Sequence, residues 1–506
     1  MGIIVKQSIK GSIWSYAGVV IGFITTTYLF TRYLTPDIVG LFGLLVSIST
    51  ITAGLSSLGM NGVTSRLFPY FRNNDTGHNG YFLTAIIPQL VGFGLFLLIF
   101  ALFRGRIIAT NLEKSPLFAR YVYLTIPLTF FFSLFNFLDT YNKLLYNTVL
   151  GTFLQEFLQR IMISIVVILY IIKLISLNQL IIGYAIAVSI KSIIIFSYLL
   201  KEKKISFRVD FKFITRKLRK EIVSVALFSI IGGLGSMIVF NIDKIVVNQL
   251  IDLKNTGIYT IAFYFGTLVV IPSRPLLRIS GTLVADAWAK NNLAKVRTIY
   301  YKSCINQLII GGFLFLGIWA NINNILILLG PDYEQSKWVI FFIGLGYLFD
   351  MMTGANGLVI SYSKYYRVSL WFILILVVLV TTFLYTLIPL WGITGAAIAI
   401  ALALFLNNLM RYLFLFRKFR LQPFNYKFAI IILFYTGLYF LAKLIPQQHL
   451  ILDLFLRNSV IILLTCLFVC FVPVSKDILA IRNSLVSRLR KKNLRSQNHS
   501  PNRGRK

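Results

Sequence analysis

The feature that most constrains this chain is a succession of long apolar runs separated by short charged segments. A helix needs about 20 mostly apolar residues to cross the hydrocarbon core of a bilayer. Backbone polar groups in lipid must be satisfied within their own segment, so we expect helices rather than strands. We count about fourteen such runs, at residues 11–33, 38–60, 81–103, 117–138, 157–175, 178–200, 221–249, 257–278, 303–329, 336–361, 367–388, 391–416, 427–445 and 453–474.

Composition points to the same fold class. Hydrophobic residues make up 57% of the 506 residues and charged residues only 13%, where about a quarter is usual for a soluble domain. A soluble protein could not cover so much apolar surface with so few charges. The sequence therefore predicts an all-α polytopic membrane protein.

Charge is unevenly distributed along the chain. Lys and Arg number 50 against 16 Asp and Glu, a net charge of +34, and they concentrate in alternate connections between the runs. Because basic loops stay in the cytoplasm, we expect both termini and the long loops on the inner side, and no nucleic-acid partner. A loop at 201–220 and a tail at 475–506 are the most basic segments, and we expect the tail to attract anionic membrane lipids. The connection at 104–116 is an exception, with three basic residues on the predicted outside.

Two halves of the chain resemble each other. Sliding the sequence on itself by 217 residues pairs Ser12 with Ser229, Ile13 with Ile230, Gly18 with Gly235, Ile21 with Ile238, Phe23 with Phe240 and Gly40 with Gly257. The match joins a glycine-containing span, a short turn and a glycine opening the next span. A parallel repeat of this kind is transporter architecture, with a central cavity between two lobes.

The repeat sets the predicted domain boundaries. We expect an N-lobe of six helices at 1–200 and a C-lobe of six helices at 221–416. The basic loop at 201–220 would link the lobes. Two further helices would occupy 417–474, followed by the basic tail at 475–506.

Charged side chains inside the predicted spans are candidates for a substrate cavity. A central Lys costs about 2.5–3.5 kcal/mol on insertion scales, so Lys191, in the sixth span, should face a cavity or an ion-pair partner. Asp243 and Lys244 lie late in the seventh span. Adjacent residues on a helix do not face each other, so each needs its own partner, and ion coupling and interhelical pairing both stay open. Asp350, in the tenth span, is a candidate for the cavity lining.

Two further groups of residues suit a transporter. Arg66, Arg274 and Arg278 stand at predicted cytoplasmic helix ends, where they either anchor the helices by snorkelling or form a phosphate-binding entrance. Glycines weaken a helix interior, so the seventh span contains a candidate hinge. Its members are Gly232, Gly233 and Gly235.

The sequence offers little for catalysis or metal binding. Cys304, Cys466 and Cys470 lie in or beside apolar runs with no third or fourth ligand near them. No GxxxxGK[ST] phosphate loop occurs, and the chain has three histidines. We therefore expect no catalytic residues, no metal and no cofactor. Coupling to a proton or sodium gradient stays open.

Five stretches carry a family resemblance. They are Met1 to Ile9, Arg32 to Leu41, Asn255 to Ala262, Leu329 to Tyr333, and Ile388 to Ala399. Together they resemble the polysaccharide-transporter branch of the MOP superfamily, which includes the O-antigen flippases, the lipid II flippases and the MATE drug antiporters. The resemblance runs to about residue 416, and its motifs are loose sets of Gly, Pro and small residues.

The resemblance implies a function that composition alone does not. It implies a flippase for undecaprenyl-pyrophosphate-linked oligosaccharide, an O-antigen or other surface-polysaccharide unit, working by alternating access in the bacterial inner membrane. Its partners would be that substrate, anionic lipids and polysaccharide polymerase or assembly proteins. A lipid II-type flippase and a MATE-like cation-coupled drug exporter are the alternatives. A membrane polymerase or ligase fits less well, because the predicted outside loops are short.

Overall fold

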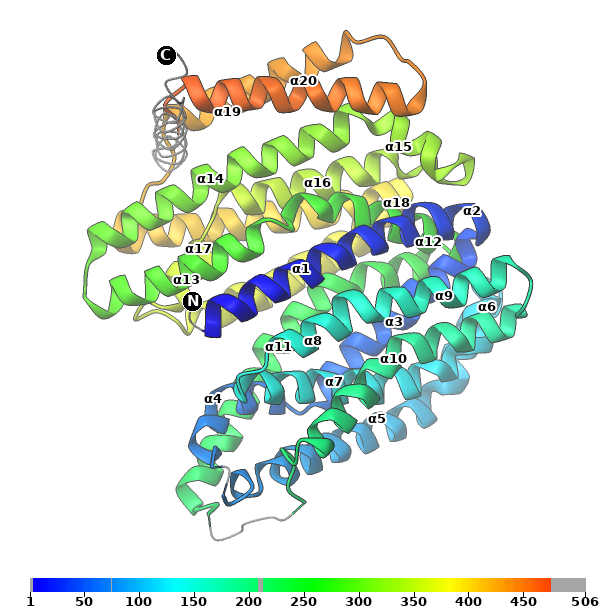
Figure 1. Ribbon diagram of the computed structural model, residues 1–506, viewed down its shortest axis with the longest axis vertical. Coiled ribbons are helices and arrows are strands. Elements are labelled where there is room, and N and C mark those ends of the chain that lie inside the picture. The colour runs from blue at the N-terminus through cyan, green and yellow to red at the C-terminus, as the bar shows by residue number, and fades with distance from the viewer. Residues whose placement is uncertain (1–2, 74, 208–212, 475–506) are drawn as a thin grey trace, which may run out of the picture. The chain divides into compact units, whose positions relative to one another are not determined.

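In the computed structural model, residues 3–73, 75–207 and 213–474 are described, and the regular elements in that part of the chain are helices (Figure 1). The first half comprises α1 (Ile3–Ile24), η1 (Thr25–Phe30), α2 (Thr31–Tyr33), α3 (Pro36–Ser56), α4 (Met60–Phe71), η2 (His78–Gly80), α5 (Tyr81–Asn111), α6 (Pro116–Tyr121), η3 (Val122–Leu124), α7 (Thr125–Leu144), α8 (Val149–Thr152), η4 (Phe153–Leu158), α9 (Gln159–Ile171) and α10 (Leu177–Lys201).

The second half continues in the same way. It comprises α11 (Arg216–Leu250), α12 (Leu253–Thr267), η5 (Leu268–Val270), α13 (Ser273–Ala289), α14 (Leu293–Ala320), α15 (Ile322–Leu329), η6 (Pro331–Tyr333), α16 (Ser336–Met352), α17 (Asn356–Ser361), α18 (Val368–Phe419), α19 (Tyr426–Lys443) and α20 (Leu450–Phe471). The predicted all-α polytopic class is confirmed.

The number of spans differs from the expected fourteen. Within the described residues, eleven helices are long and apolar enough to cross a membrane, or twelve if α12–η5 and α13, bent by 44°, form one span. We expected a single span at 336–361, but the structure has two helices there, the 17-residue α16 and the short α17. The exact count of fourteen is therefore not confirmed.

Two predicted spans, 367–388 and 391–416, fall within the 52-residue α18. The backbone leaves helical geometry at Trp391 (φ −132°) and at Gly392 (φ 56°, ψ −138°). A positive φ suits glycine because it has no Cβ. The break therefore lies at the boundary expected between the spans 367–388 and 391–416.

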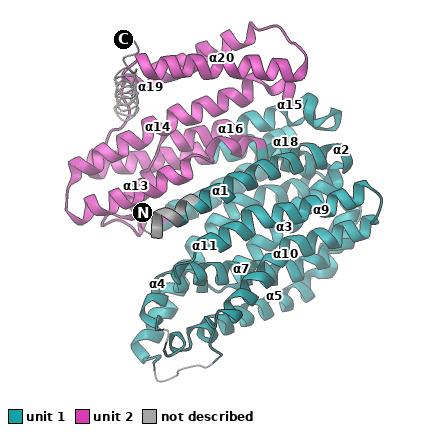
Figure 2. Ribbon diagram, viewed as in Figure 1, with its two compact units in different colours: residues 1–264, 326–342, 370–403 teal, residues 265–325, 343–369, 404–506 magenta. Residues whose placement is uncertain are grey.

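The chain folds as two compact units (Figure 2). The first, unit 1, contains residues 1–264, 326–342 and 370–403. The second, unit 2, contains residues 265–325, 343–369 and those from 404 onward. The predicted lobe boundaries at 200 and 220 stay a prediction, and the basic tail at 475–506 lies outside the described residues.

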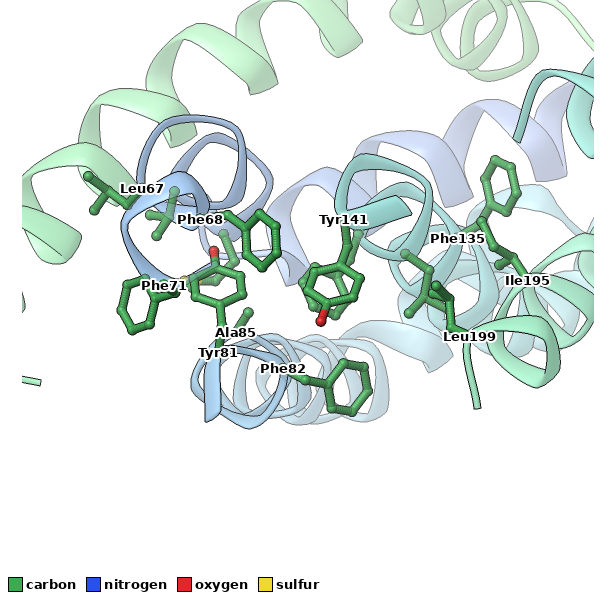
Figure 3. Close-up of a cluster of buried hydrophobic side chains, with 14 of the residues drawn as sticks. Leu67, Phe68, Phe71, Tyr81, Phe82, Ala85, Phe135, Tyr141, Ile195 and Leu199 are labelled. Carbon is green, nitrogen blue, oxygen red and sulfur yellow. The ribbon is translucent and has the colours of Figure 1, made fainter. Parts of the chain in front are cut away.

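In unit 1, α3 packs against α5, α7 and α11, and α10 packs against α7 and α9. A buried cluster joins several of these helices, as Figure 3 shows. Phe68 and Phe71 of α4 meet Tyr81 of α5, Tyr141 of α7 and Leu199 of α10. The tyrosine hydroxyls in this apolar core are satisfied, because that of Tyr81 donates to Thr64 Oγ1 at 2.9 Å and that of Tyr141 to the Lys204 carbonyl at 2.7 Å.

Two glycines related by the sequence repeat contact each other where α3 and α12 begin. A Cβ atom placed on Gly40 would lie 2.1 Å from the Leu253 carbonyl oxygen and 2.9 Å from Gly257 N. A Cβ placed on Gly257 would lie 1.9 Å from the Pro36 carbonyl oxygen and 2.9 Å from Gly40 N. Pro36 and Leu253 are themselves separated by the repeat offset. A two-fold axis produces this reciprocal kind of contact, so the geometry agrees with the predicted parallel repeat.

In unit 2, α14 packs against α13, α19 and α20. A buried ion pair fixes the last of these helices: Arg457 Nε donates to Asp453 at 2.8 Å, and the Arg457 guanidinium also donates to the Ala442 and Ile445 carbonyls at the end of α19. Asn324 of α15 donates to the same carboxylate. A buried charge needs such partners, so this group has a structural explanation.

Candidate substrate cavity

A cavity of about 420 Å³ lies inside unit 1. Helices α1–η1, α3, α7, η4–α9, α10 and α12 form its wall. The lining residues are Gly22, Thr25, Thr26, Phe30, Val46, Thr50, Phe132, Phe135, Asn136, Gln155, Glu156, Gln159, Arg160, Ile163, Tyr184, Val188, Lys191 and Tyr264. Elements far apart in the sequence therefore bring amides, hydroxyls, aromatic rings and three charges to one place.

Lys191, the candidate from the sixth span, lies on this wall, and its role in substrate binding stays a prediction. Its side chain is buried, and Nζ donates to Gln159 Oε1 at 2.8 Å. The ammonium also lies 4.6 Å from the ring centroid of Phe135 and 5.3 Å from that of Phe132. Aromatic faces attract a cation, so the charge is held by an amide and two rings rather than by a carboxylate.

Arg160 is the second cation of the cavity. Its Nη2 donates to Glu156 Oε2 at 3.1 Å, one helical turn earlier, and its Nη1 donates to the Tyr264 hydroxyl at 3.2 Å. Both members of the ion pair keep about a quarter of their side-chain surface exposed. Since a guanidinium has five N–H donors, these two contacts leave others for a ligand.

The Gly18-x-x-x-Gly22 sequence of α1 explains how Arg160 fits. A Cβ on Gly18 would lie 1.9 Å from the Glu156 carbonyl oxygen, and a Cβ on Gly22 would lie 1.8 Å from Arg160 Nη1. Farther along the same pair of helices, Thr25 Oγ1 and Ser164 Oγ are 2.6 Å apart. Small residues four apart allow close helix approach in membranes, and here they also make room for a guanidinium.

Both helices widen into π-helical turns beside the cavity. One is η1, which contributes Thr25, Thr26 and Phe30 to the wall, and the other is η4, which contributes Gln155 and Glu156. A π turn shifts the register of the side chains that follow it, and such turns are frequent at functional sites. Here they direct polar side chains of two apolar helices into the same space.

The lining suits an anion that also carries hydroxyl groups. Arg160 and Lys191 exceed the single carboxylate among the lining residues, Glu156, by one positive charge. Arg and Lys recognise phosphate by charge-assisted hydrogen bonds. The amides, the threonines and the two tyrosines add donors, acceptors and ring faces to the wall.

Asp243 and Lys244 do not line this cavity. Asp243 is fully buried, accepts a hydrogen bond from the Tyr259 hydroxyl at 2.9 Å and lies 3.5 Å from the Lys244 ammonium. Lys244 also lies 4.3 Å from the ring centroid of Phe263. Each neighbour has a partner of its own on α12, Tyr259 for Asp243 and Phe263 for Lys244. The two side chains also contact each other, which was not expected, because both turn toward α12 and the long Lys side chain reaches the carboxylate. Their ion-coupling role stays a prediction.

Asp350 belongs to unit 2, where it accepts a hydrogen bond from Asn408 Nδ2 at 2.9 Å. Asn408 Oδ1 in turn accepts bonds from Thr353 Oγ1 and Asn356 Nδ2, at 3.0 and 2.8 Å. This polar group has partners of its own, and a cavity role for Asp350 stays a prediction.

The three candidate entrance arginines are exposed: Arg66 on α4, and Arg274 and Arg278 on α13. Their phosphate-binding role stays a prediction. The candidate hinge lies in α11, which runs through Gly232, Gly233 and Gly235 without a break. A Cβ on Gly235 would lie 2.2 Å from Ile373 Cγ2, so this glycine serves close packing, and bending there also stays a prediction.

Sequence reasoning missed Arg160 and Glu156. The fifth span was expected to begin at 157, which left both residues at its cytoplasmic edge, whereas the helical span covers Val149–Ile171. Glu156 and Arg160 are an i, i+4 pair of opposite charge, and Gly18 and Gly22 have the same spacing. Either pattern could have identified this contact, because residues four apart share a helix face.

Within the residues that the structure describes, a second hollow and the potential metal ligands offer no comparable site. An apolar hollow of about 460 Å³ lies beside the break in α18, lined by Trp338, Phe342, Trp391, Thr394 and Ile398, and its wall carries no charge. Throughout the described part of the chain, no three His, Cys, Asp or Glu side chains gather as metal ligands would. The cavity of unit 1 is therefore the candidate site.

Comparisons with known proteins agree with the resemblance found in the sequence. The model of a family described as "Polysaccharide biosynthesis protein" matches residues 6–283, more than half of the chain. A comparison with curated protein sequences found no match.

Solved structures show the fold. The lipid II flippase MurJ in an inward closed conformation matches with a TM-score of 0.73 at 15% identity, covering 91% of this chain and 98% of that chain. An inward-facing multidrug resistance MATE family transporter of the MOP superfamily matches with a TM-score of 0.57 at 15% identity, covering 83% and 98%. A MOP superfamily transporter from Pyrococcus furiosus gives 0.54 at 15%, covering 82% and 96%. At these identities the likeness establishes a MurJ- and MATE-like fold.

Proposed function

Because this chain belongs to the polysaccharide biosynthesis protein family, we propose that it is a flippase for a lipid-linked oligosaccharide. The substrate is an undecaprenyl-pyrophosphate-linked unit of O-antigen or another surface polysaccharide. The protein carries it from the inner to the outer leaflet of the bacterial inner membrane by alternating access, and it performs no catalysis.

The observation that carries this proposal is the cationic cavity of unit 1. Arg160 and Lys191 line a space within helices that are otherwise apolar. A charge inside the membrane costs several kcal/mol unless a cavity or partner receives it, so the one positive charge that Glu156 leaves unbalanced on this wall favours an anionic ligand. The pyrophosphate between lipid and sugar has that charge, and the amides and hydroxyls suit the sugar.

The alternatives differ in what the cavity would carry. A lipid II-type flippase would use the same cations for the same pyrophosphate with a different glycan. A MATE-like drug exporter should present acidic groups to a cationic drug, whereas the carboxylate on this wall, Glu156, is already paired with Arg160. A polymerase or ligase would need a catalytic group at the outer face.

The proposal also includes the topology, the partners and the energy source. Both termini lie in the cytoplasm, anionic lipids attract the basic segments, and polymerase or assembly proteins receive the product. Since no ATP-binding loop is present in the sequence, a proton or sodium gradient is the candidate energy source.

A deletion strain tests the function directly. Accumulation of full-length undecaprenyl-pyrophosphate-linked glycan in the inner membrane, with loss of surface polysaccharide, is the expected result. Normal glycan with new sensitivity to cationic drugs would favour the exporter. Repeat units that reach the outer leaflet but stay unpolymerised would favour the enzyme.

Lys191→Ala tests the cavity itself. We expect transport in the complemented strain to fall about tenfold or more, the effect of losing a charge-assisted contact, while the protein level in the membrane stays unchanged. Lys201→Ala is the matched control, because Lys201 ends the same helix and is exposed. Normal transport by the Lys191→Ala protein would make Lys191 a packing residue.

A further inference from the structure

We propose that Glu156 is an internal counter-ion that occupies Arg160 while the cavity is empty and that the diphosphate of the substrate displaces it. The inference rests on the proposed function, since it takes the ligand to be a diphosphate. It goes further by assigning the Glu156–Arg160 pair as a switch that the ligand opens.

The pair has the geometry of an exchangeable contact. A single bond of 3.1 Å joins Nη2 of Arg160 to Oε2 of Glu156, rather than the two parallel bonds that guanidinium and carboxylate form at their strongest. Both side chains remain about a quarter exposed and line the cavity. The buried Asp453–Arg457 pair differs in both respects: both carboxylate oxygens accept bonds from Arg457, and only 2% of the Asp453 side chain is exposed.

The charges favour the exchange. With Glu156 on Arg160, the wall carries one net positive charge. A diphosphate brings more negative charge than a carboxylate and can contact Arg160 and Lys191 together. Lys191 is held by the neutral Gln159 amide and by aromatic faces, so it is available to a second phosphate. Anions with less negative charge than a diphosphate would not displace the carboxylate. The pair therefore makes the cavity selective for diphosphates.

Arg160 has contacts besides Glu156 that keep its guanidinium in place. Gly22 lies directly against Nη1 of the Arg160 guanidinium, and the Tyr264 hydroxyl accepts a bond from the same nitrogen. Glu156 belongs to the π-helical turn η4, and its carboxylate contacts Arg160 through the bond from Nη2. The substrate would therefore bind Arg160 in its present position and displace the Glu156 side chain.

Trp14 offers a reporter for that movement. Its indole lies 4.8 Å from the ring centroid of Phe153 and 4.7 Å from that of Phe157. These two rings belong to η4 and flank Glu156 in the sequence. A rearrangement of the turn on ligand binding should change the fluorescence of Trp14, and Trp14→Phe identifies its share of the signal.

The test measures binding to the full-length protein in nanodiscs by calorimetry, with inorganic pyrophosphate and farnesyl diphosphate as probes. We expect Glu156→Gln to tighten binding about tenfold, the order expected when one charge-assisted hydrogen bond no longer competes. Arg160→Gln should weaken binding by a similar factor. In the Arg160→Gln background, Glu156→Gln should change binding less than threefold. Glu221→Gln, an exposed glutamate on α11, is the matched control and should leave binding unchanged.

The outcomes separate this proposal from the proposed function. Tightening with farnesyl diphosphate alone would support the exchange and assign the site to a lipid-borne diphosphate, and tightening with both probes would assign it to the diphosphate group itself. Weakened or unchanged binding by Glu156→Gln would overturn the exchange, because Glu156 would then orient Arg160 or play no part. In either of those cases, accumulated lipid-linked glycan in the deletion strain would leave the flippase function standing.

Discussion

Two glycine contacts in unit 1 have opposite consequences. At the beginnings of α3 and α12, Gly40 and Gly257 bring two backbones together, and each glycine lies against the other helix's carbonyl oxygen. In α1, Gly22 lies instead against the guanidinium of Arg160. The first contact excludes side chains and is reciprocal across the repeat. The second admits one charged side chain, and the position related to Gly22 by the repeat offset is Val239.

A missing Cβ can therefore either let two helix backbones come into contact or make room for a side chain that binds a ligand. What differs is the neighbouring residue. At the α3–α12 crossing the nearest atoms are main-chain atoms, which cannot move separately from the helix. At Gly22 the nearest atoms are the far end of a long side chain, which can. The effects of filling the two spaces should therefore differ in kind.

The largest effect is expected from Gly257→Leu. Its Cβ would meet the Pro36 carbonyl oxygen at 1.9 Å, and because the backbone cannot yield, we expect a loss of about 3 kcal/mol or more, beyond ordinary overpacking. Membrane protein level and the melting temperature of the purified protein measure it. Gly94→Leu on α5 is the control, because no atom lies within 4 Å of a Cβ there. Equal tolerance of both changes would mean that the crossing is not tightly packed.

The next effect is expected from Gly22→Ala. The new methyl group would displace the Arg160 guanidinium, so transport should fall about as far as with Arg160→Ala, while the melting temperature changes little because a side chain can move aside. Gly18→Ala sharpens the test. Its Cβ would meet the backbone of Glu156, so it should lower the melting temperature as well. Loss of stability by Gly22→Ala without loss of transport would contradict the distinction drawn between the two contacts.

The smallest effect is expected from Tyr259→Phe, two residues from Gly257. It removes one buried hydrogen bond to the Asp243 carboxylate, a loss of about 1.5–3 kcal/mol because the acceptor is charged, and keeps the ring. We expect a melting temperature lower by a few degrees and unchanged transport. A defect as large as that of Gly257→Leu would show that the polar bond, rather than the backbone contact, holds α12 in place.

The candidate site was predictable where a charge interrupts an apolar run. Lys191 stands alone in such a run, and the structure places it on the cavity wall. Arg160 and Glu156 escaped notice because a polar stretch at the edge of a span looks like a loop. Asp243 was recognisable as costly to bury, but its partner Tyr259 belongs to another helix, and no local pattern indicates such a pair.

The sequence by itself determined the all-helical membrane class and the positions of most spans, and it predicted a repeat. These follow from local rules, since apolar length selects a membrane helix and matched glycines mark equivalent turns. Tertiary structure alone decided which polar side chains share a cavity. Helices that are distant in sequence enclose it, and their facing depends on two π-helical turns and on glycines that let one helix approach another. Such contacts depend on packing between segments, which the hydropathy of each segment does not specify.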